Sequence, residues 1–156
     1  MPMPPPALDC AHAIEYAVVD NSVTFEQRFT LNVGGEWLGE VPQLAICRNL
    51  DETELMVFHC GSDWKVLGVA AGFDSIDEAK AKTERSFRGL TPKWAPTGYS
   101  RDDAASYLAG HFKDMKCSFC GRLPMQFQSI VGTKVRICNH CVKEFYDALH
   151  GGSKET

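Results

Sequence analysis

Two pairs of cysteines with the spacing Cys-x-x-Cys constrain this 156-residue chain more than any other feature. Cys117 and Cys120 form the first pair, and Cys138 and Cys141 form the second. Two intervening residues let the chain turn so that both sulfurs point to one side, and Gly121 gives the first turn the backbone freedom it needs. Four thiolates complete a tetrahedral site without water, so we predict one structural Zn²⁺. Two disulfides or a redox dithiol are the alternatives, which the paired spacing disfavours.

The residues between and after the two pairs predict a hairpin followed by a helix. Short strands are expected at 127–131 and 134–137, where they would return the second pair to the first. Asn139 is expected to cap a helix that ends near Gly151. Apolar residues recur along this helix at i, i+3, i+4 and i+7, namely Val142, Phe145, Tyr146 and Leu149. This order of elements predicts a treble-clef-like zinc module, whose apolar stripe is too wide for so small a domain to bury alone.

The motif CSFCG, followed by FQSIVG and by V-x-IC-x-x-CV at the start of a helix, resembles the amino-terminal zinc-binding domain of the bacterial ClpX protein unfoldase over residues 115–149. The resemblance implies structural zinc on the four cysteines and a module that dimerises and docks substrates or adaptor proteins. It also implies that the dimer or docking surface contains Phe127, Ile130, Val131, Ile137, Val142 and Phe145.

Two departures from that family stand out. Asn139 and His140 lie between the second pair of cysteines, where the family usually has an acidic residue. The ATPase of the family has no counterpart here, because the chain contains no phosphate-binding G-x-x-x-x-G-K-[ST] motif. We therefore do not expect this chain to drive unfolding with ATP. His111 and His140 lie near the cysteines but are not needed as ligands once four thiolates bind.

Composition and charge narrow the class of protein. A hydrophobic content of 44% supports a core beyond the zinc module. No run of eighteen apolar residues and no secretory signal is found, and seven cysteines, an odd number, suit the reducing cytoplasm. Residues 1–110 carry 9 basic and 16 acidic residues, a net −7, whereas residues 111–156 carry 7 and 4, a net +3. The acidic front half argues against general nucleic-acid binding.

The front part is predicted to be an α+β domain at residues 7–98, between a proline-rich disordered tail at 1–6 and a linking helix at 99–114. Residues 7–20 fit a helix or a strand, and we favour a helix. Alternating or apolar runs then predict a four-stranded antiparallel meander, with strands at Thr24 to Val33, Gln43 to Leu50, Glu54 to Cys60 and Trp64 to Gly72.

Helices and linkers complete the expected organisation. A capping box at Ser75 to Glu78 begins a helix that runs to Phe87 and covers the sheet. Gly89 to Tyr99 is expected to be a linker in which Trp94 packs on the domain. A second helix, Arg101 to Phe112, is expected to bridge the two parts and could cover some of the apolar surface of the zinc module. Residues 150–156 are predicted to be a disordered tail.

The sequence favours a non-enzymatic protein that binds zinc and another protein chain, itself included, with a possible link to protein quality control and unfolded-protein binding. One alternative is a zinc ribbon that binds nucleic acid through basic side chains, namely Lys116, Arg122, Lys134, Arg136 and Lys143. A cysteine enzyme built on Cys60 is a weaker alternative. His59 precedes that cysteine on a predicted strand, so their side chains should point to opposite faces.

Overall fold

The computed structural model describes residues 2–27, 31–112, 116–122, 129–131 and 135–151. The chain divides into two compact units, Met1–Tyr107 and Leu108–Thr156. The division falls within helix α2 (Arg101–His111). Each unit is described by itself below.

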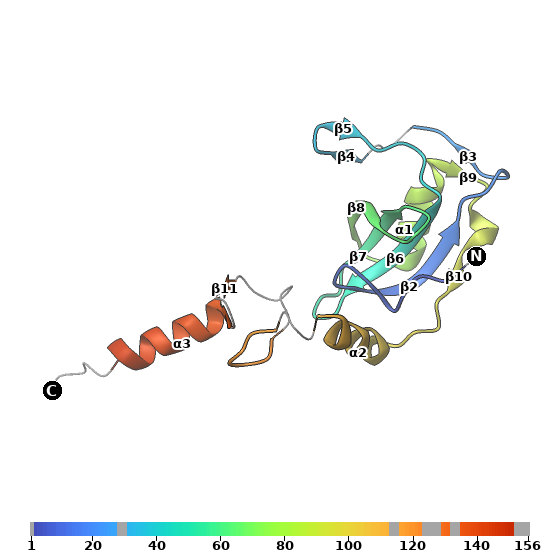
Figure 1. Ribbon diagram of the computed structural model, residues 1–156. Coiled ribbons are helices and arrows are strands. Elements are labelled where there is room, and N and C mark those ends of the chain that lie inside the picture. Colours follow the sequence, from blue (N-terminus) through green and yellow to red (C-terminus); the bar gives the residue numbers. More distant parts are fainter. Residues whose placement is uncertain (1, 28–30, 113–115, 123–128, 132–134, 152–156) are drawn as a thin grey trace. The chain divides into compact units, whose positions relative to one another are not determined.

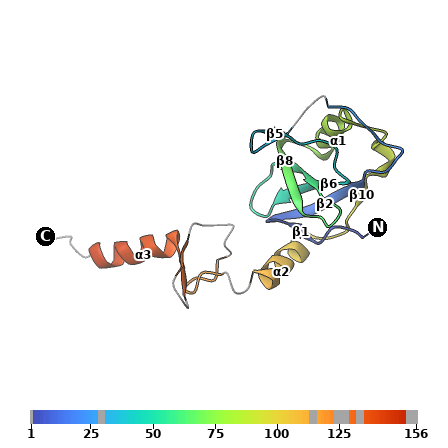
Figure 2. The same cartoon turned by 45° about the horizontal axis from the view of Figure 1, so that its top comes forward.

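The front unit is built on one antiparallel sheet with the strand order β1-β2-β6-β7-β8, and β10 also pairs with β2 (Figures 1 and 2). The members are β1 (Ala7–Leu8), β2 (Ala11–Val18), β6 (Gln43–Asn49), β7 (Leu55–Cys60), β8 (Val66–Phe73) and β10 (Ala95–Pro96). The last three strands of the predicted meander are confirmed as β6, β7 and β8. The α+β class is likewise confirmed, but the sheet has six strands where four were predicted.

Residues 7–20, which we expected to form a helix, instead form β1 and the central strand β2. The pairing of β2 with β6 shifts register between Ala13 and Glu15. Such a bulge moves the alternation of faces by one residue. Ala13 therefore packs in the same cluster as Tyr16, three positions later, while Ile14 and Ala17 pack on the opposite face. This broken alternation is why the segment imitates a helical pattern.

The expected single strand from Thr24 to Val33 is also wrong. β3 (Thr24–Phe25) pairs with β9 (Phe87–Arg88), and β4 (Asn32–Val33) forms a separate hairpin with β5 (Glu36–Trp37). Residues 28–30, between β3 and β4, lie outside the described part of the chain. Neither short pair joins the main sheet. The strand β3 forms its ladder with β9, and β4 forms its ladder with β5.

Helix α1 (Ile76–Glu84) covers one face of the sheet. Ser75 Oγ accepts a hydrogen bond from the amide of Glu78, as the capping box predicts. The helix ends before Phe87, which we had expected to lie within it. Phe87 instead pairs with Phe25 in the short β3–β9 ladder, and its ring is fully buried against the sheet.

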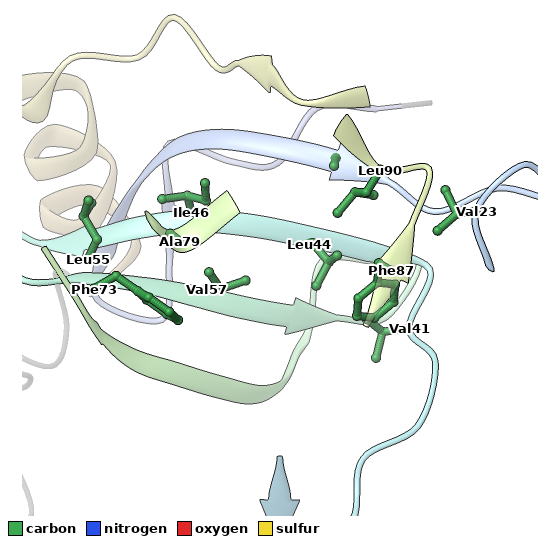
Figure 3. Packing of buried hydrophobic residues seen from close by; sticks show 11 residues of the cluster. Val23, Val41, Leu44, Ile46, Leu55, Val57, Phe73, Ala79, Phe87 and Leu90 are labelled. Atoms are coloured by element: carbon green, nitrogen blue, oxygen red, sulfur yellow. The ribbon is translucent and has the colours of Figure 1, made fainter. Parts of the chain in front are cut away.

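Two apolar clusters occupy the two faces of this sheet. Figure 3 shows the cluster beneath α1, where Leu44, Ile46 and Val57 extend from the strands toward Ala79 and Phe87. On the other face, alternate residues of the same strands pack with Trp64; they include Ala45, Cys47, Phe58 and Cys60. A strand that is apolar on both faces, such as β6, is therefore central to the unit.

The segments expected to be a tail and a linker are both packed. Pro4 is fully buried, and Pro2 accepts a hydrogen bond of 3.1 Å from the indole of Trp64. Residues 2–6 are therefore not a free tail. In the expected linker, a 3₁₀ turn (Thr91–Lys93) precedes β10, and Trp94 packs on the core as predicted. Thr97 Oγ1 donates a hydrogen bond of 2.7 Å to the carbonyl of Ala13.

Helix α2 begins with a reciprocal cap, in which Ser100 Oγ accepts from the amide of Asp103 and Asp103 accepts from the amide of Ser100. Arg101 Nε donates to the carbonyl of Leu50 over 2.7 Å. The second unit contains the hairpin β11 (Ser129–Val131) and β12 (Arg136–Cys138), followed by α3 (Asn139–His150). The predicted hairpin and following helix are confirmed within the described residues.

Candidate metal centre

The first cysteine knuckle is a closed turn. The amide of Gly121 donates to the carbonyl of Cys117 over 2.9 Å, and the amide of Cys117 donates to the carbonyl of Arg122 over 2.9 Å. Gly121 has a φ of 74°, in the left-handed region that glycine adopts without strain. This conformation reverses the chain directly after Cys120.

Backbone hydrogen bonds join this knuckle to the second strand of the hairpin. The amide of Ser118 donates to the carbonyl of Arg136 over 2.7 Å, and the amide of Arg136 donates back to Ser118 Oγ over 2.9 Å. Ser118 lies between the first two cysteines, and Arg136 lies two residues before the third. The pairing therefore holds the two knuckles at a fixed distance from each other.

The second knuckle combines the end of β12 with the start of α3. Cys138 is the N-cap of α3, and its Sγ accepts a hydrogen bond of 3.4 Å from the amide of Cys141. We had predicted Asn139 at the cap, but that residue is already in the helix. A thiolate suits this position because the first amides of a helix attract negative charge. Cys138 therefore serves as a cap and as a metal-ligand candidate.

The four cysteine sulfurs converge on one point. All four Sγ atoms lie within 4.8 Å of one another. Cys117 and Cys141 are 3.8 Å apart, and Cys120 and Cys138 are 3.6 Å apart. A tetrahedral zinc with Zn–S bonds of about 2.3 Å requires sulfurs about 3.8 Å apart. The distances therefore fit zinc, whereas a disulfide requires a separation of about 2 Å. The four cysteines form a C4 zinc site.

The polypeptide favours the thiolate form at two of these positions. Burial raises the pKa of Cys117, but hydrogen bonds from the amides of Cys120, Phe119 and Cys138 outweigh it and lower that pKa to about 6. The pKa of Cys138 is also lowered. Burial raises it, but hydrogen bonds to the sulfur, first among them the one from the amide of Cys141, outweigh that effect. Burial raises the pKa of Cys141, and the neighbouring thiols add to the effect. Zinc supplies the charge that deprotonates such a thiol.

Arg122 provides a balancing positive charge at the exposed side of the site. Its guanidinium donates a hydrogen bond of 3.4 Å to Cys120 Sγ. That hydrogen bond raises the pKa of Arg122. Four thiolates and one Zn²⁺ leave a net charge of about −2, so a neighbouring guanidinium stabilises the cluster.

The predicted partner-binding residues fall into three groups. Ile130, Val131, Val142 and Phe145 are exposed, with Ile130 at 66%. Ile137 is half-buried and packs against the cysteines, so it serves the interior of the module. Phe127 lies outside the described residues.

Phe119 is an exposed aromatic residue of the same module that the sequence analysis did not name. Its ring contacts that of Phe145 edge-on, with centroids 5.2 Å apart, and 57% of the residue is exposed. The sequence does indicate this exposure, because Phe119 lies between the two cysteines of the first Cys-x-x-Cys pair. A knuckle whose cysteines point inward must turn such a large side chain outward.

His59 and Cys60 lie on opposite faces of β7. His59 is on the face toward α1, where its ring lies near that of Phe87, and Cys60 packs in the cluster on the other face. Burial raises the pKa of Cys60 to about 12. A fully buried thiol with such a pKa is a poor nucleophile, which weakens the cysteine-enzyme alternative.

A family model, the ClpX C4-type zinc finger, matches residues 115–151. The comparisons with curated proteins and with solved structures found no significant match. Within the described ranges, no helix combines the length and the apolar character needed to span a membrane. The family match includes all four cysteines of the metal site and about a quarter of the chain. Residues 115–151 of this protein are therefore similar to the ClpX C4-type zinc finger.

Proposed function

We propose that this chain is a non-enzymatic protein-interaction protein whose zinc finger pairs with the same finger of a second copy. The observation that carries the proposal is an exposed apolar surface on a very small module built around the four-cysteine site. Its members on α3 are Val142, Phe145, Tyr146 and Leu149, and those outside the helix are Phe119, Ile130, Val131 and Val135. We call this set the finger patch.

The spacing of apolar residues along α3 gives the finger patch a continuous central stripe. Val142, Phe145, Tyr146 and Leu149 recur on one side of the helix, and 80% of Leu149 is exposed. Phe119 extends the surface through its contact with Phe145. Exposed apolar surface of this extent is a common mark of a protein-binding site. Two copies that pack these stripes together would remove the apolar area from water in one step.

The charges of the module support protein as the partner over nucleic acid. Lys143 forms an ion pair with Asp147, and Arg122 donates to a cysteine sulfur. These interactions compete with phosphate contacts for the two side chains. Lys134, a third basic residue of the nucleic-acid alternative, lies outside the described residues. None of the seven cysteines forms a disulfide, which is in keeping with a reducing compartment such as the cytoplasm.

Sedimentation equilibrium of the zinc-loaded full chain tests the pairing, over concentrations from about 1 to 100 µM. We expect a reversible shift from one to two copies as concentration rises. The apparent mass should change little with added salt, because apolar contacts are not screened. A single-copy mass throughout the range, together with salt-sensitive binding to a DNA duplex, would replace this proposal with the nucleic-acid alternative.

A further inference from the structure

The hairpin of β4 and β5 has a defined geometry at its turn and at its base. Gly34 and Gly35 form the two-residue turn with φ values of 62° and 89°, and a tight hairpin turn of this class requires positive φ at both positions. The amide of Gly35 donates a hydrogen bond of 2.9 Å to Asn32 Oδ1. At the base, the amide of Leu38 donates to the carbonyl of Leu31 over 2.7 Å. The backbone of the hairpin is therefore well determined.

One face of this hairpin packs on strand β8, beside which it lies in Figures 1 and 2. The contact is at Gly68, which the side chains of Leu31, Val33 and Leu38 approach closely. A Cβ at Gly68 would lie 2.9 Å from Leu38 and 3.2 Å from Val33. Successive residues of a strand point to opposite faces. Trp37, which precedes Leu38 on β5, therefore points away from β8.

Trp37 is uncovered on that outer face. Its exposed fraction is 61%. The residue opposite it in the ladder is Asn32, whose side chain is bonded to the turn. Within the part of the chain that the structure describes, the indole of Trp37 makes neither a hydrogen bond nor a contact with another ring. A tryptophan that presents both its ring face and its N–H has the properties of an interface hot spot.

Only negative charge accompanies this tryptophan along the chain. The charged side chains between residues 31 and 47 are Glu36 and Glu40, and both are exposed. Neither forms an ion pair in the described ranges. Residues 1–110 as a whole carry a net charge of −7. An open aromatic face beside unpaired carboxylates favours a cation, and above all a guanidinium, which can stack on an indole and pair with a carboxylate.

We propose that Trp37, Glu36 and Glu40 form a docking surface for an arginine-bearing basic segment of another protein. One guanidinium stacks on the indole of Trp37, and the two carboxylates pair with it and with a neighbouring basic side chain. The negative charge of the front part also attracts such a segment at longer range. This surface shares no residue with the finger patch, so it gives the chain a second contact in addition to the pairing proposed above.

Two peptides of one shape test the proposal on the zinc-loaded full chain. The first is a short glycine peptide that contains two arginines, and the second replaces both arginines with citrulline, which is uncharged and has the same shape. The NMR signal of the Trp37 indole N–H reports binding. We expect a saturable shift with the arginine peptide and an affinity about tenfold higher than that of the citrulline peptide. Added salt should reduce this difference.

Matched variants assign the ring and the charge. Trp37→Ala should abolish the shifts of the amides of Asn32 and Leu38, whereas Trp37→Phe should retain part of the binding because a smaller aromatic face remains. Glu36→Gln should weaken the arginine peptide about threefold and leave the citrulline peptide unchanged. Its control is Asp77→Asn, which removes the same charge from the exposed side of α1. Because Trp37 and Glu36 are exposed, these variants should keep the wild-type Tm within about 2 °C.

Three results would overturn the assignment. The first is the absence of a saturable shift of the Trp37 indole with the arginine peptide. The second is equal affinity for the two peptides at low salt, which would remove the preference for a cation. The third is a loss of chain pairing in Trp37→Ala, measured by sedimentation, which would assign the indole to contact with a second copy of this chain. Pairing that is lost in Phe145→Asp and kept in Trp37→Ala would leave the two surfaces separate, as proposed.

Discussion

The backbone amide of Cys138 donates a hydrogen bond of 3.4 Å to the Sγ of Cys117, across a separation of 21 residues. One sulfur of the first knuckle is thus held by the backbone of the second. Because Cys138 Sγ in turn accepts from the amide of Cys141, the metal ligands and the local backbone form one connected unit. Loss of a single cysteine should therefore disturb both knuckles.

We expect the purified chain to carry one zinc per copy and Cys138→Ser to lose it. The serine removes a metal ligand but can still cap α3, and metal affinity at such sites is coupled to folding. Atomic absorption after gel filtration should give about one zinc for the wild type and less than about a tenth for the variant. Cys10→Ser, outside the cluster, is the control. Full zinc content in Cys138→Ser would remove our ligand assignment.

Removal of zinc should leave the front unit folded, because both apolar clusters of its sheet belong to that unit. All three tryptophans, Trp37, Trp64 and Trp94, lie in Met1–Tyr107, so their fluorescence reports this unit alone. We expect a chelator to change its Tm by less than about 2 °C while the far-UV signal of α3 is lost. A large fall in the Tm measured by tryptophan fluorescence would show that the stability of the front unit depends on the zinc module.

Phe145→Asp should separate the paired chains without releasing zinc. Phe145 is 43% exposed, lies at the centre of the finger patch and is not a ligand. A charge buried in an apolar interface has no partner, so the dissociation constant should rise at least tenfold, or about 1.4 kcal/mol. Lys143→Asp, which puts the same side chain elsewhere on α3, is the control. Unchanged sedimentation of Phe145→Asp would place the pairing surface elsewhere.

The stability of the front unit should fall as pH drops from about 6.5 toward 4. Burial lowers the pKa of His59 from 6.5 to about 4, so the unfolded chain binds more protons in this window. The loss from this group should be about 2 kcal/mol between about pH 7 and about pH 4.5. Urea unfolding followed by tryptophan fluorescence measures it. The His59→Phe variant should lose less unfolding free energy than the wild type over this pH range, and the difference should equal the contribution of His59. An identical loss in both proteins would exclude His59 as the cause.

Gly89→Ala should be more damaging than Gly98→Ala. Both glycines have a positive φ, 90° and 77°, so alanine strains the backbone at either position. A Cβ at Gly89 would also lie 2.9 Å from the carbonyl oxygen of Ser22, whereas one at Gly98 meets nothing within 4 Å. We expect losses of about 3 and about 1 kcal/mol respectively in urea unfolding. Equal losses would show that the Ser22 segment moves aside freely.

The chemistry of the metal site was readable from local spacing alone. Two Cys-x-x-Cys pairs demand four converging sulfurs whatever the remainder of the chain does, because the metal imposes its own geometry. The helix after Cys141 followed from its apolar period, and the cap at Ser75 followed from a four-residue motif. Such features depend only on residues that are close together in the sequence, so they can be predicted from the sequence alone.

The fold of the front unit depends on long-range contacts that cannot be predicted from the hydrophobic pattern of the sequence. A bulge beside Ile14 broke the alternation of β2, so its residues imitated a helix until β6 supplied the pairing. Phe87 continued the helical period of α1 yet left the helix, because pairing with Phe25 buried its ring. A cavity beside His59 exists only where β7, β8, α1 and β9 meet. Pairing and packing over long sequence separations override local propensity, and only the tertiary structure shows which partner each residue finds.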